Sequence, residues 1–279
     1  MLIQVTLTVH EAKRVIAKGV VRLPAVQEAF RSGKILLKGG TTVSAVCEEL
    51  VGRCLRISGR IVPNGAKSAG LTLTGFHSTL IEHGEATDVD DTLEEVIERL
   101  GPEDVVILGA NAIDPLGHAA MMCGAFLGGK PGRILSGLMA EVKNIFIAAG
   151  LEKLVPGSLP EIIQQFGRKS VTLSMGMAVG LTPLVGRIIT EKEAIPLLAD
   201  VTCAVIGKGG ILGAEGATTL IIGGEEEEVM KAFGILASIK GEKVSGVQES
   251  LTECSSPSEK CKLHPGCIYK RSRPARATL

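Results

Sequence analysis

The chain has 279 residues, enough for one large domain or two modest ones around a buried core. Lysine plus arginine and aspartate plus glutamate balance at 30 each, which excludes a global field that attracts nucleic acid or an anionic membrane. Hydrophobic residues make up 45% of the chain and are mostly aliphatic, which excludes disorder of the main body. The longest uncharged apolar stretch, residues 170–186, is interrupted by glycine and proline and falls short of a membrane span. Seven cysteines without a secretory signal predict reduced thiols and a cytoplasmic protein.

Short apolar runs alternate with helical stretches through the first half of the chain. Strands are predicted at residues 3–9, 34–38, 55–62, 104–108 and 144–149. Helices are predicted at residues 11–30, with an interruption near Pro24, and at residues 43–51 and 91–100. This alternation is typical of an α/β fold, with a mostly parallel sheet covered by helices on both faces.

The second half of the chain has a different pattern. A strand is expected at residues 171–177, and Thr190 with Glu193 forms a capping box that begins a helix. The remaining elements are strands at 201–206 and 217–222, a helix at 225–239 and a closing strand at 243–247. This order predicts a smaller ferredoxin-like α+β subdomain. We therefore divide the chain into an α/β ligand-binding domain at 1–165, the ferredoxin-like subdomain at 166–247 and a polar tail at 248–279.

The strongest local signal is the loop that joins the strand at 34–38 to the next helix. Its residues are Gly39, Gly40, Thr41 and Thr42. Glycine lets the backbone approach a ligand closely, the free N–H groups and dipole of a helix start favour an anion, and the two hydroxyls add donors. The alternative is an ordinary strand–helix turn with a threonine N-cap.

A second polar loop follows the buried strand at 104–108. Asn111, Asp114 and His118 lie just past the end of that strand, where ligands bind in open α/β sheets. The alternative is a plain Asp-Pro turn followed by a solvated histidine. Two further glycine-rich loops, 63–70 with Lys67 and 207–216, bring a lysine to a turn, and an ordinary strand connection is the favoured interpretation of both.

Three segments in this order resemble one known superfamily. They are the Gly-Gly-Thr-Thr loop, the sequence ILGANAIDPLGH at 107–118, and the sequence IFIAAGLEKLVP at 145–156. Together they resemble the ribose-phosphate isomerase, glucosamine-phosphate deaminase and CoA-transferase superfamily, which includes the sensor domain of DeoR-type repressors. The third segment is similar to the signature of its lactate-utilisation branch. The resemblance covers roughly residues 34–165.

The resemblance implies a small anionic ligand, either phosphorylated, carboxylated or CoA-linked. Gly39, Gly40, Thr41 and Thr42 would hold its anionic group, and the candidate ligand contacts also include Asn111, His118 and Lys67. An enzyme that isomerises the metabolite or transfers an acyl or CoA group needs a titratable residue there, for which Asp114, Glu152 and Lys153 are the candidates. A non-catalytic sensor or scaffold is the alternative, so whether the protein is an enzyme is left open.

The tail concentrates potential metal ligands. Cys254, Cys261, His264 and Cys267 lie within fourteen residues, and thiolate and imidazole groups at this spacing suit tetrahedral zinc. A tail with incidental thiols is the alternative. We predict no nucleotide cofactor, no membrane partner and no nucleic-acid partner, because the basic end of the chain has no aromatic platform. Association into a homo-oligomer is left open.

Overall fold

A computed structural model describes residues 1–68, 75–251, 253, 261–262, 264 and 266–270. Its centre is a six-stranded mixed sheet with the strand order β12-β10-β7-β2-β5-β6. Four neighbouring strands are parallel, and β5 and β6 add an antiparallel hairpin at one edge. The strands are β2 (Lys34–Lys38), β5 (Ser78–Glu82), β6 (Glu85–Asp88), β7 (Val105–Leu108), β10 (Asn144–Ala148) and β12 (Arg187–Ile189).

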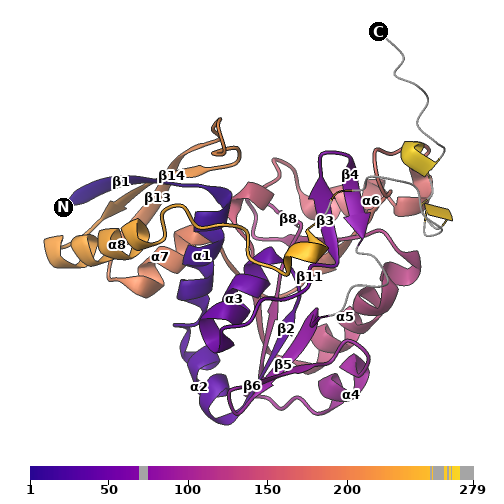
Figure 1. The fold of residues 1–279 in the computed structure, drawn as a ribbon, viewed down its shortest axis with the longest axis horizontal. Coiled ribbons are helices and arrows are strands. Elements are labelled where there is room, and N and C mark those ends of the chain that lie inside the picture. The colour runs from indigo at the N-terminus through magenta and orange to yellow at the C-terminus, as the bar shows by residue number, and fades with distance from the viewer. Residues whose placement is uncertain (69–74, 252, 254–260, 263, 265, 271–279) are drawn as a thin grey trace, which may run out of the picture.

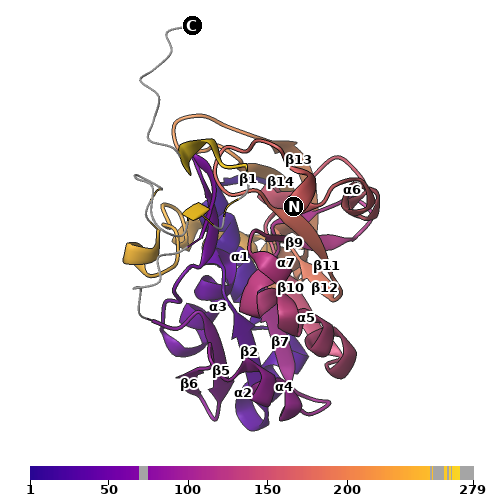
Figure 2. The ribbon, with the colours of Figure 1, turned by 90° about the vertical axis from the view of Figure 1, so that its right-hand side faces the viewer.

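Continuous apolar runs form the parallel strands because both of their faces are covered. All four residues of β7, with the sequence VVIL, are buried, as expected for a strand with helices on each side. Figure 1 shows α1 and α3 on one side of the central strands and α4 and α5 on the other, and Figure 2 looks at the sheet from the side of α5. These helices and their neighbour are α1 (Val9–Val20), α2 (Pro24–Ser32), α3 (Thr41–Val51), α4 (Leu93–Glu98) and α5 (Gly129–Glu141).

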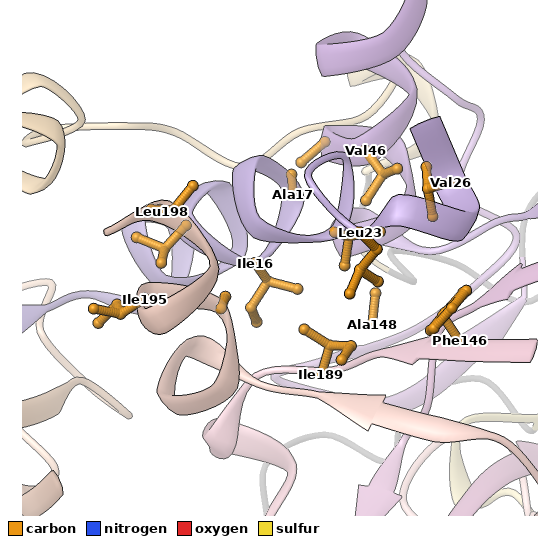
Figure 3. Packing of buried hydrophobic residues seen from close by; sticks show 14 of the residues in the cluster. Ile16, Ala17, Leu23, Val26, Val46, Phe146, Ala148, Ile189, Ile195 and Leu198 are labelled. Atoms are coloured by element: carbon orange, nitrogen blue, oxygen red, sulfur yellow. The ribbon is translucent and has the colours of Figure 1, made fainter. Parts of the chain in front are cut away.

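The larger core lies between the sheet and helices α1, α2, α3 and α7 (Glu191–Leu198). In Figure 3, Ile16 and Leu23 from the helical layer face Ala148 and Ile189 from the strands. Helices α1 and α7 approach closely at Gly19, where an added Cβ would lie 2.7 Å from the Cβ of Ala194. The glycine thus sets how near these two helices pack.

A second core covers the opposite face of the sheet. Leu36, Val106 and Ile147 alternate with residues of the first core along their strands, and they pack against α4 and α5. This period-two alternation assigns each strand side chain to one of the two faces. The same alternation decides to which face of the sheet a polar side chain at the end of a strand points.

A three-stranded antiparallel sheet stands beside the main body, with the order β1-β14-β13. Figure 1 shows this sheet with α7 and α8 (Glu226–Ser238) beneath it. Its strands are β1 (Leu2–Leu7), β13 (Thr202–Lys208) and β14 (Thr218–Gly223). The N-terminal strand β1 occupies the edge beside β14, and the strand expected at 243–247 is not formed.

Smaller elements complete the described chain. They are the hairpin β3 (Gly59–Val62) and β4 (Gly65–Ser68), the sheet of β8 (Ala112–Ile113), β9 (Ala119–Cys123) and β11 (Gly180–Leu184), the helix α6 (Leu159–Gln165), and 3₁₀ turns that include η2 (Leu151–Lys153). Among the described residues, no helix is both long and apolar enough to cross a membrane.

The strands expected at 34–38, 104–108 and 144–149 form in the main sheet, whereas the strand expected at 3–9 lies in the sheet of β14 and that expected at 55–62 is limited to β3. The capping box at Thr190 is formed, with the Thr190 N–H donating to Glu193. The strand expected at 171–177 is wrong, since this segment makes only isolated bridges. The hairpin β5–β6 and helix α5 were not predicted. The α/β fold is confirmed; the central sheet is mixed, with three parallel pairings and the two antiparallel pairings β2–β5 and β5–β6.

Candidate functional site

The carboxyl ends of four parallel strands meet at one edge of the central sheet. The segments that follow β2, β7, β10 and β12 begin at Gly39, Gly109, Ala149 and Thr190. Neighbouring strands lie about 4.8 Å apart, so the ends of β2 and β10 are separated by roughly 10 Å. Ligands of open α/β sheets bind at this edge, and it brings together the loops of all three resembling segments.

The turn from β2 into α3 needs both of its glycines. A Cβ on Gly39 would lie 2.3 Å from Nδ1 of His77, so no side chain fits there. Gly40 is the N-cap residue of α3 and has φ 144°, a conformation that favours glycine. No side chain caps α3, so the N–H groups of its first turn, at Thr41 and Thr42, remain available as donors.

Lys38 is the last residue of β2 and directly precedes this turn. By strand alternation its side chain joins the face of Leu36, on the side of α4 and α5. Lys38 is only 5% exposed. No hydrogen-bond or ion-pair partner of its amine occurs among the residues that the structure describes. Burial lowers the pKa of Lys38 to about 8, because removal from water penalises the charged form.

The titratable groups that face Lys38 are held by other partners. Asp90 accepts hydrogen bonds from the Ser78 N–H and from Arg56 Nη2, at 2.8 and 2.7 Å. His77 Nδ1 lies 2.9 Å from the Arg56 carbonyl, and burial lowers the pKa of His77. Cys123 lies 3.2 Å from the Thr182 hydroxyl. These groups influence Lys38 electrostatically without forming a contact with its amine.

A second helix begins near the same lysine. Gly128 is the N-cap of α5, and its α-carbon lies so near Cys123 that an added Cβ would be 3.4 Å from the sulfur. Helix α5 also has no side-chain cap. The Gly129 N–H donates to the Phe126 carbonyl and Pro131 has no N–H, so the start of α5 has fewer free donors than the start of α3. Helix starts favour anions.

Another buried polar cluster lies at the end of β10, under the start of α1. Lys13 Nζ is 3.4 Å from Glu152 Oε1, and Lys153 Nζ is 3.9 Å from the same oxygen. Burial lowers the pKa of Lys13, and the carboxylate of Glu152 opposes that shift. His10 joins the cluster with a lowered pKa, caused first by burial and then by Lys13. Neither Glu152 oxygen nor His10 Nδ1 has a well-formed hydrogen bond within the described chain.

Glu191, which lies just after β12, holds this cluster in place through hydrogen bonds. Its carboxylate accepts the Leu151 N–H at 2.9 Å and the Thr218 hydroxyl at 2.7 Å. The same hydroxyl accepts from Lys208 Nζ at 3.0 Å. Glu191 is fully buried, and burial raises its pKa. Through Leu151, Glu191 fixes the 3₁₀ turn that carries Glu152 and Lys153.

The Asp114 carboxylate accepts hydrogen bonds from nearby backbone N–H groups. Its side chain is fully buried. It accepts the N–H groups of Leu116, His118 and Leu159, each at 2.9 Å, and lies 2.8 Å from His118 Nδ1. Burial acts to raise its pKa, but these hydrogen bonds prevail and lower the pKa to about 2. Asp114 thus ties the β8–β9 turn to the start of α6.

The other predicted ligand contacts are spread over several elements. Asn111 follows β7 at the carboxyl edge, and its side-chain oxygen accepts the Met122 N–H at 2.9 Å. His118 is 46% exposed in the β8–β9 turn. Lys67 lies in β4 and donates to the Glu253 carbonyl. The structure therefore brings residues 39–42, Asn111 and Glu152 to one edge, whereas Lys67 belongs to a separate hairpin.

The predicted zinc ligands lie partly outside the described residues. Cys254 is not among them. Cys267 forms an isolated bridge with Ser174, and the His264 N–H donates to the Cys261 carbonyl at 3.1 Å. Within the described residues, no group of three or more histidine, cysteine or acidic side chains is arranged to hold a metal ion. The zinc site remains a prediction.

Sequence reasoning missed Lys38, Lys13, His10 and Glu191. A signal existed for Lys38, since period-two alternation places it on the buried face of Leu36. A signal also existed for Lys13, which lies three and four residues before the buried Ile16 and Ala17 on the apolar face of α1. Glu191 follows an N-cap residue, a position where acids are normally solvated, so its burial could not be foreseen.

Comparison of the chain with protein-family models, with curated proteins and with solved structures finds no match.

Proposed function

We propose that the carboxyl edge of the central sheet binds a small anionic metabolite that carries a phosphate, a carboxylate or a CoA-linked group. Lys38 and the first turn of α3 would hold the anionic group. The observation that carries the proposal is Lys38, a residue only 5% exposed whose amine has no hydrogen-bond or ion-pair partner among the described residues. A buried ammonium without a counter-charge is costly, and a bound anion would remove that cost.

Three features support an anion rather than another ligand. The N–H groups of Thr41 and Thr42 begin an uncapped eleven-residue helix, whose dipole favours negative charge. Beside Gly40 there is open space, since an added Cβ would meet nothing within 4 Å. Asp90, the carboxylate that influences Lys38 electrostatically, already accepts hydrogen bonds from Arg56 and from the Ser78 N–H. Its charge is therefore largely compensated within the protein.

The resemblance to the isomerase and CoA-transferase superfamily supports the same ligand class. Both enzymatic alternatives, isomerisation and acyl or CoA transfer, remain predictions, as does the ferredoxin-like interpretation of residues 166–247. A non-catalytic sensor would use the same anion site. Asp114 has four contacts of its own, so under this proposal it positions its loop. Glu152 and Lys153 are then the remaining candidates for proton transfer.

The test is isothermal titration calorimetry with inorganic phosphate, pyruvate and CoA as probes. Lys38→Met should weaken the probe that binds by roughly 10- to 100-fold, because a charge-assisted hydrogen bond contributes about 1.5–3 kcal/mol. Lys34→Met is the matched control, since Lys34 lies at the opposite end of the same strand beside Glu82 and Asp104. Equal affinity in the Lys38→Met and wild-type proteins, or no binding of any probe, would overturn the proposal.

A further inference from the structure

His77 lies against the glycine turn that begins α3. A Cβ added to Gly39 would lie 2.3 Å from His77 Nδ1 and 2.4 Å from Cε1, so the imidazole packs directly on the Gly39 α-carbon. The Gly39 N–H donates to the His77 carbonyl at 3.0 Å, and the two residues are cross-strand neighbours, one step beyond the paired Lys38 and Ser78. Cross-strand neighbours share a face of the sheet. His77 therefore belongs to the face of Leu37, whose core α3 covers, and Lys38 belongs to the opposite face.

The hydrogen bond to Arg56 decides which ring nitrogen of His77 carries a proton. His77 Nδ1 lies 2.9 Å from the Arg56 carbonyl oxygen, and a carbonyl oxygen only accepts, so Nδ1 donates. Burial lowers the pKa of His77; the charges of Lys38 and Arg56 act in the same direction, while the Arg56 carbonyl and Asp90 oppose them. The ring is therefore neutral near pH 7, and its Nε2 presents a lone pair.

This lone pair is available to a ligand. His77 is partly exposed, and no hydrogen-bond partner of its Nε2 occurs among the residues that the structure describes. The nitrogen can accept a hydrogen bond but cannot donate one while the ring is neutral. It is thus the complement of the N–H groups at the start of α3, which only donate.

Open space and those donors adjoin the imidazole. Nothing would lie within 4 Å of a Cβ added to Gly40, the residue between Gly39 and the helix. The first bond of the eleven-residue helix runs from the Ser44 N–H to the Gly40 carbonyl, at 2.8 Å. The Thr41 N–H precedes this bond, so it has no acceptor within the helix, and Thr41 is partly exposed.

The chain geometry limits how far apart the acceptor and the donor are. Bonds of about 1.3–1.5 Å place His77 Nε2 within about 5 Å of the Gly39 α-carbon, and the Thr41 nitrogen lies at most about 6 Å from the same carbon. The two nitrogens are therefore no more than about 11 Å apart. Hydrogen bonds of about 2.8 Å at either end leave roughly 5 Å for the ligand itself. A hydroxyl and an anionic group separated by a few bonds cover this length.

We infer that His77 makes the proposed anion site selective for ligands that carry a hydroxyl group a few bonds from the anionic group. A 2-hydroxy carboxylate and a phosphate ester with a neighbouring hydroxyl share this chemistry. The anionic group accepts from the start of α3, and the hydroxyl donates to His77 Nε2. This inference rests on the proposed anion site and specifies the ligand that the site receives.

The selectivity follows from the lone pair. A ligand hydroxyl gains a hydrogen bond to Nε2, whereas a hydrogen atom in its place gains nothing and a carbonyl oxygen brings two acceptors together. One neutral hydrogen bond at a partly exposed position corresponds to a preference of about 3- to 10-fold. His77 is in this sense a specificity-determining residue, and the inference assigns it no bond-breaking step.

The experiment is isothermal titration calorimetry with two matched pairs of probes. One pair is glycolate and acetate, and the other is glycerol 3-phosphate and propyl phosphate, so that a carboxylate source and a phosphate source are tested separately. The wild-type protein should prefer the hydroxylated member of the pair that binds by about 3- to 10-fold. His77→Phe keeps a planar ring without nitrogens and should lose this preference while still binding the other member. The control is His83→Asn, an exposed position in the β5–β6 turn with φ 53°, which asparagine tolerates.

Histidine ¹⁵N NMR of the wild-type protein tests the same point without a variant. His77 should show a protonated Nδ1 and an unprotonated Nε2, and the Nε2 resonance should shift when the hydroxylated probe binds but not when its partner does. A protonated Nε2, or an Nε2 resonance that ignores the hydroxyl, would overturn the inference even if His77→Phe does not fold.

The outcomes separate this inference from the proposed function. Equal affinity for the two members of a pair in the wild type, or a preference that survives in His77→Phe, would overturn the role of His77. The anion site would still stand if that binding is weakened by Lys38→Met. Absence of binding by all four probes would overturn both.

Discussion

The two buried lysines show how neighbours, rather than burial, decide the role of a charge. Lys13 and Lys38 have similar exposed fractions, 8% and 5%. Lys13 belongs to an ion pair with Glu152 at the interface between α1 and η2. Lys38 ends a strand at the carboxyl edge of the sheet, where no described residue pairs with its amine. The first arrangement resembles a structural contact, and the second leaves an amine that a ligand can use.

This difference predicts opposite effects on stability. Removing one member of a buried ion pair leaves the other charge uncompensated, which is strongly destabilising. Removing a buried charge that has no partner relieves a penalty instead. Proteins retain such penalties mainly where function requires them. The following variants, in order of expected effect, test whether the two lysines differ in this way.

The largest effect is expected for Glu152→Gln. This change leaves Lys13 buried without its carboxylate, and the free energy of unfolding should fall by about 3–5 kcal/mol. The measurement is urea unfolding followed by circular dichroism at pH 7. The double variant Lys13→Met with Glu152→Leu removes both charges and should recover most of the loss. A single variant as stable as the wild type would show that Lys13 and Glu152 are not coupled.

A change of opposite sign is expected for Lys38→Met. Burial penalises the ammonium form in the folded protein, so the penalty is full below about pH 8, shrinks as pH rises, and is gone above the ordinary lysine pKa of 10.5. Lys38→Met should therefore be more stable than the wild type at pH 7, by at most about 3 kcal/mol. The gain should shrink toward pH 10.5.

The measurement is urea unfolding of both proteins between pH 7 and pH 10.5, with Lys34→Met as the control. Lys34 has carboxylate partners at 3.6 and 3.7 Å, so its replacement should not stabilise the protein. A Lys38→Met protein that is less stable at every pH would indicate that the amine has a stabilising partner. That result would contradict the proposed difference between Lys38 and Lys13.

A smaller loss is expected when Asp114 is changed to alanine. One buried N–H group, that of Leu159, and two part-buried ones lose their acceptor, and the free energy of unfolding should fall by about 2 kcal/mol because the turn can partly relax. The hydrogen bonds lower the pKa of Asp114 to about 2, so its contribution is present above pH 4 and is lost as pH falls toward 2. Acid titrations of stability should show this loss in the wild type and not in the variant, while His118→Ala should change stability less.

The smallest effect is expected for Glu191→Gln. The amide oxygen can still accept the Leu151 N–H, so stability should change by less than about 1 kcal/mol at low pH. Burial raises the pKa of Glu191, which means that its stabilisation is full below pH 4.5 and declines as pH rises beyond it. The glutamine variant should lack this decline. A parallel pH dependence in both proteins would show that Glu191 ionises without cost.

Local patterns predicted the elements on which the site is built. The runs at 34–38, 104–108 and 144–149 became three neighbouring parallel strands, because β-rich apolar sequence of this length suits a strand covered on both faces. The glycines at 39 and 40 and the capping box at Thr190 were also recognised, since each depends on only a few adjacent residues. The strands at 171–177 and 243–247 were not formed, because a short apolar run specifies burial without specifying a partner strand.

The sequence by itself therefore determined which segments become strands and helices around the carboxyl edge, and that a glycine turn begins a helix there. Only the tertiary structure decided which charges meet. Lys13 and Glu152 come from distant parts of the chain, and their contact arises because α1 packs over the end of β10. Among the described residues Lys38 lacks a partner for the same reason: Asp90 and Cys123 influence it from distant elements but bind elsewhere. Local sequence sets backbone conformation, whereas the pairing of buried charges depends on how elements pack in space.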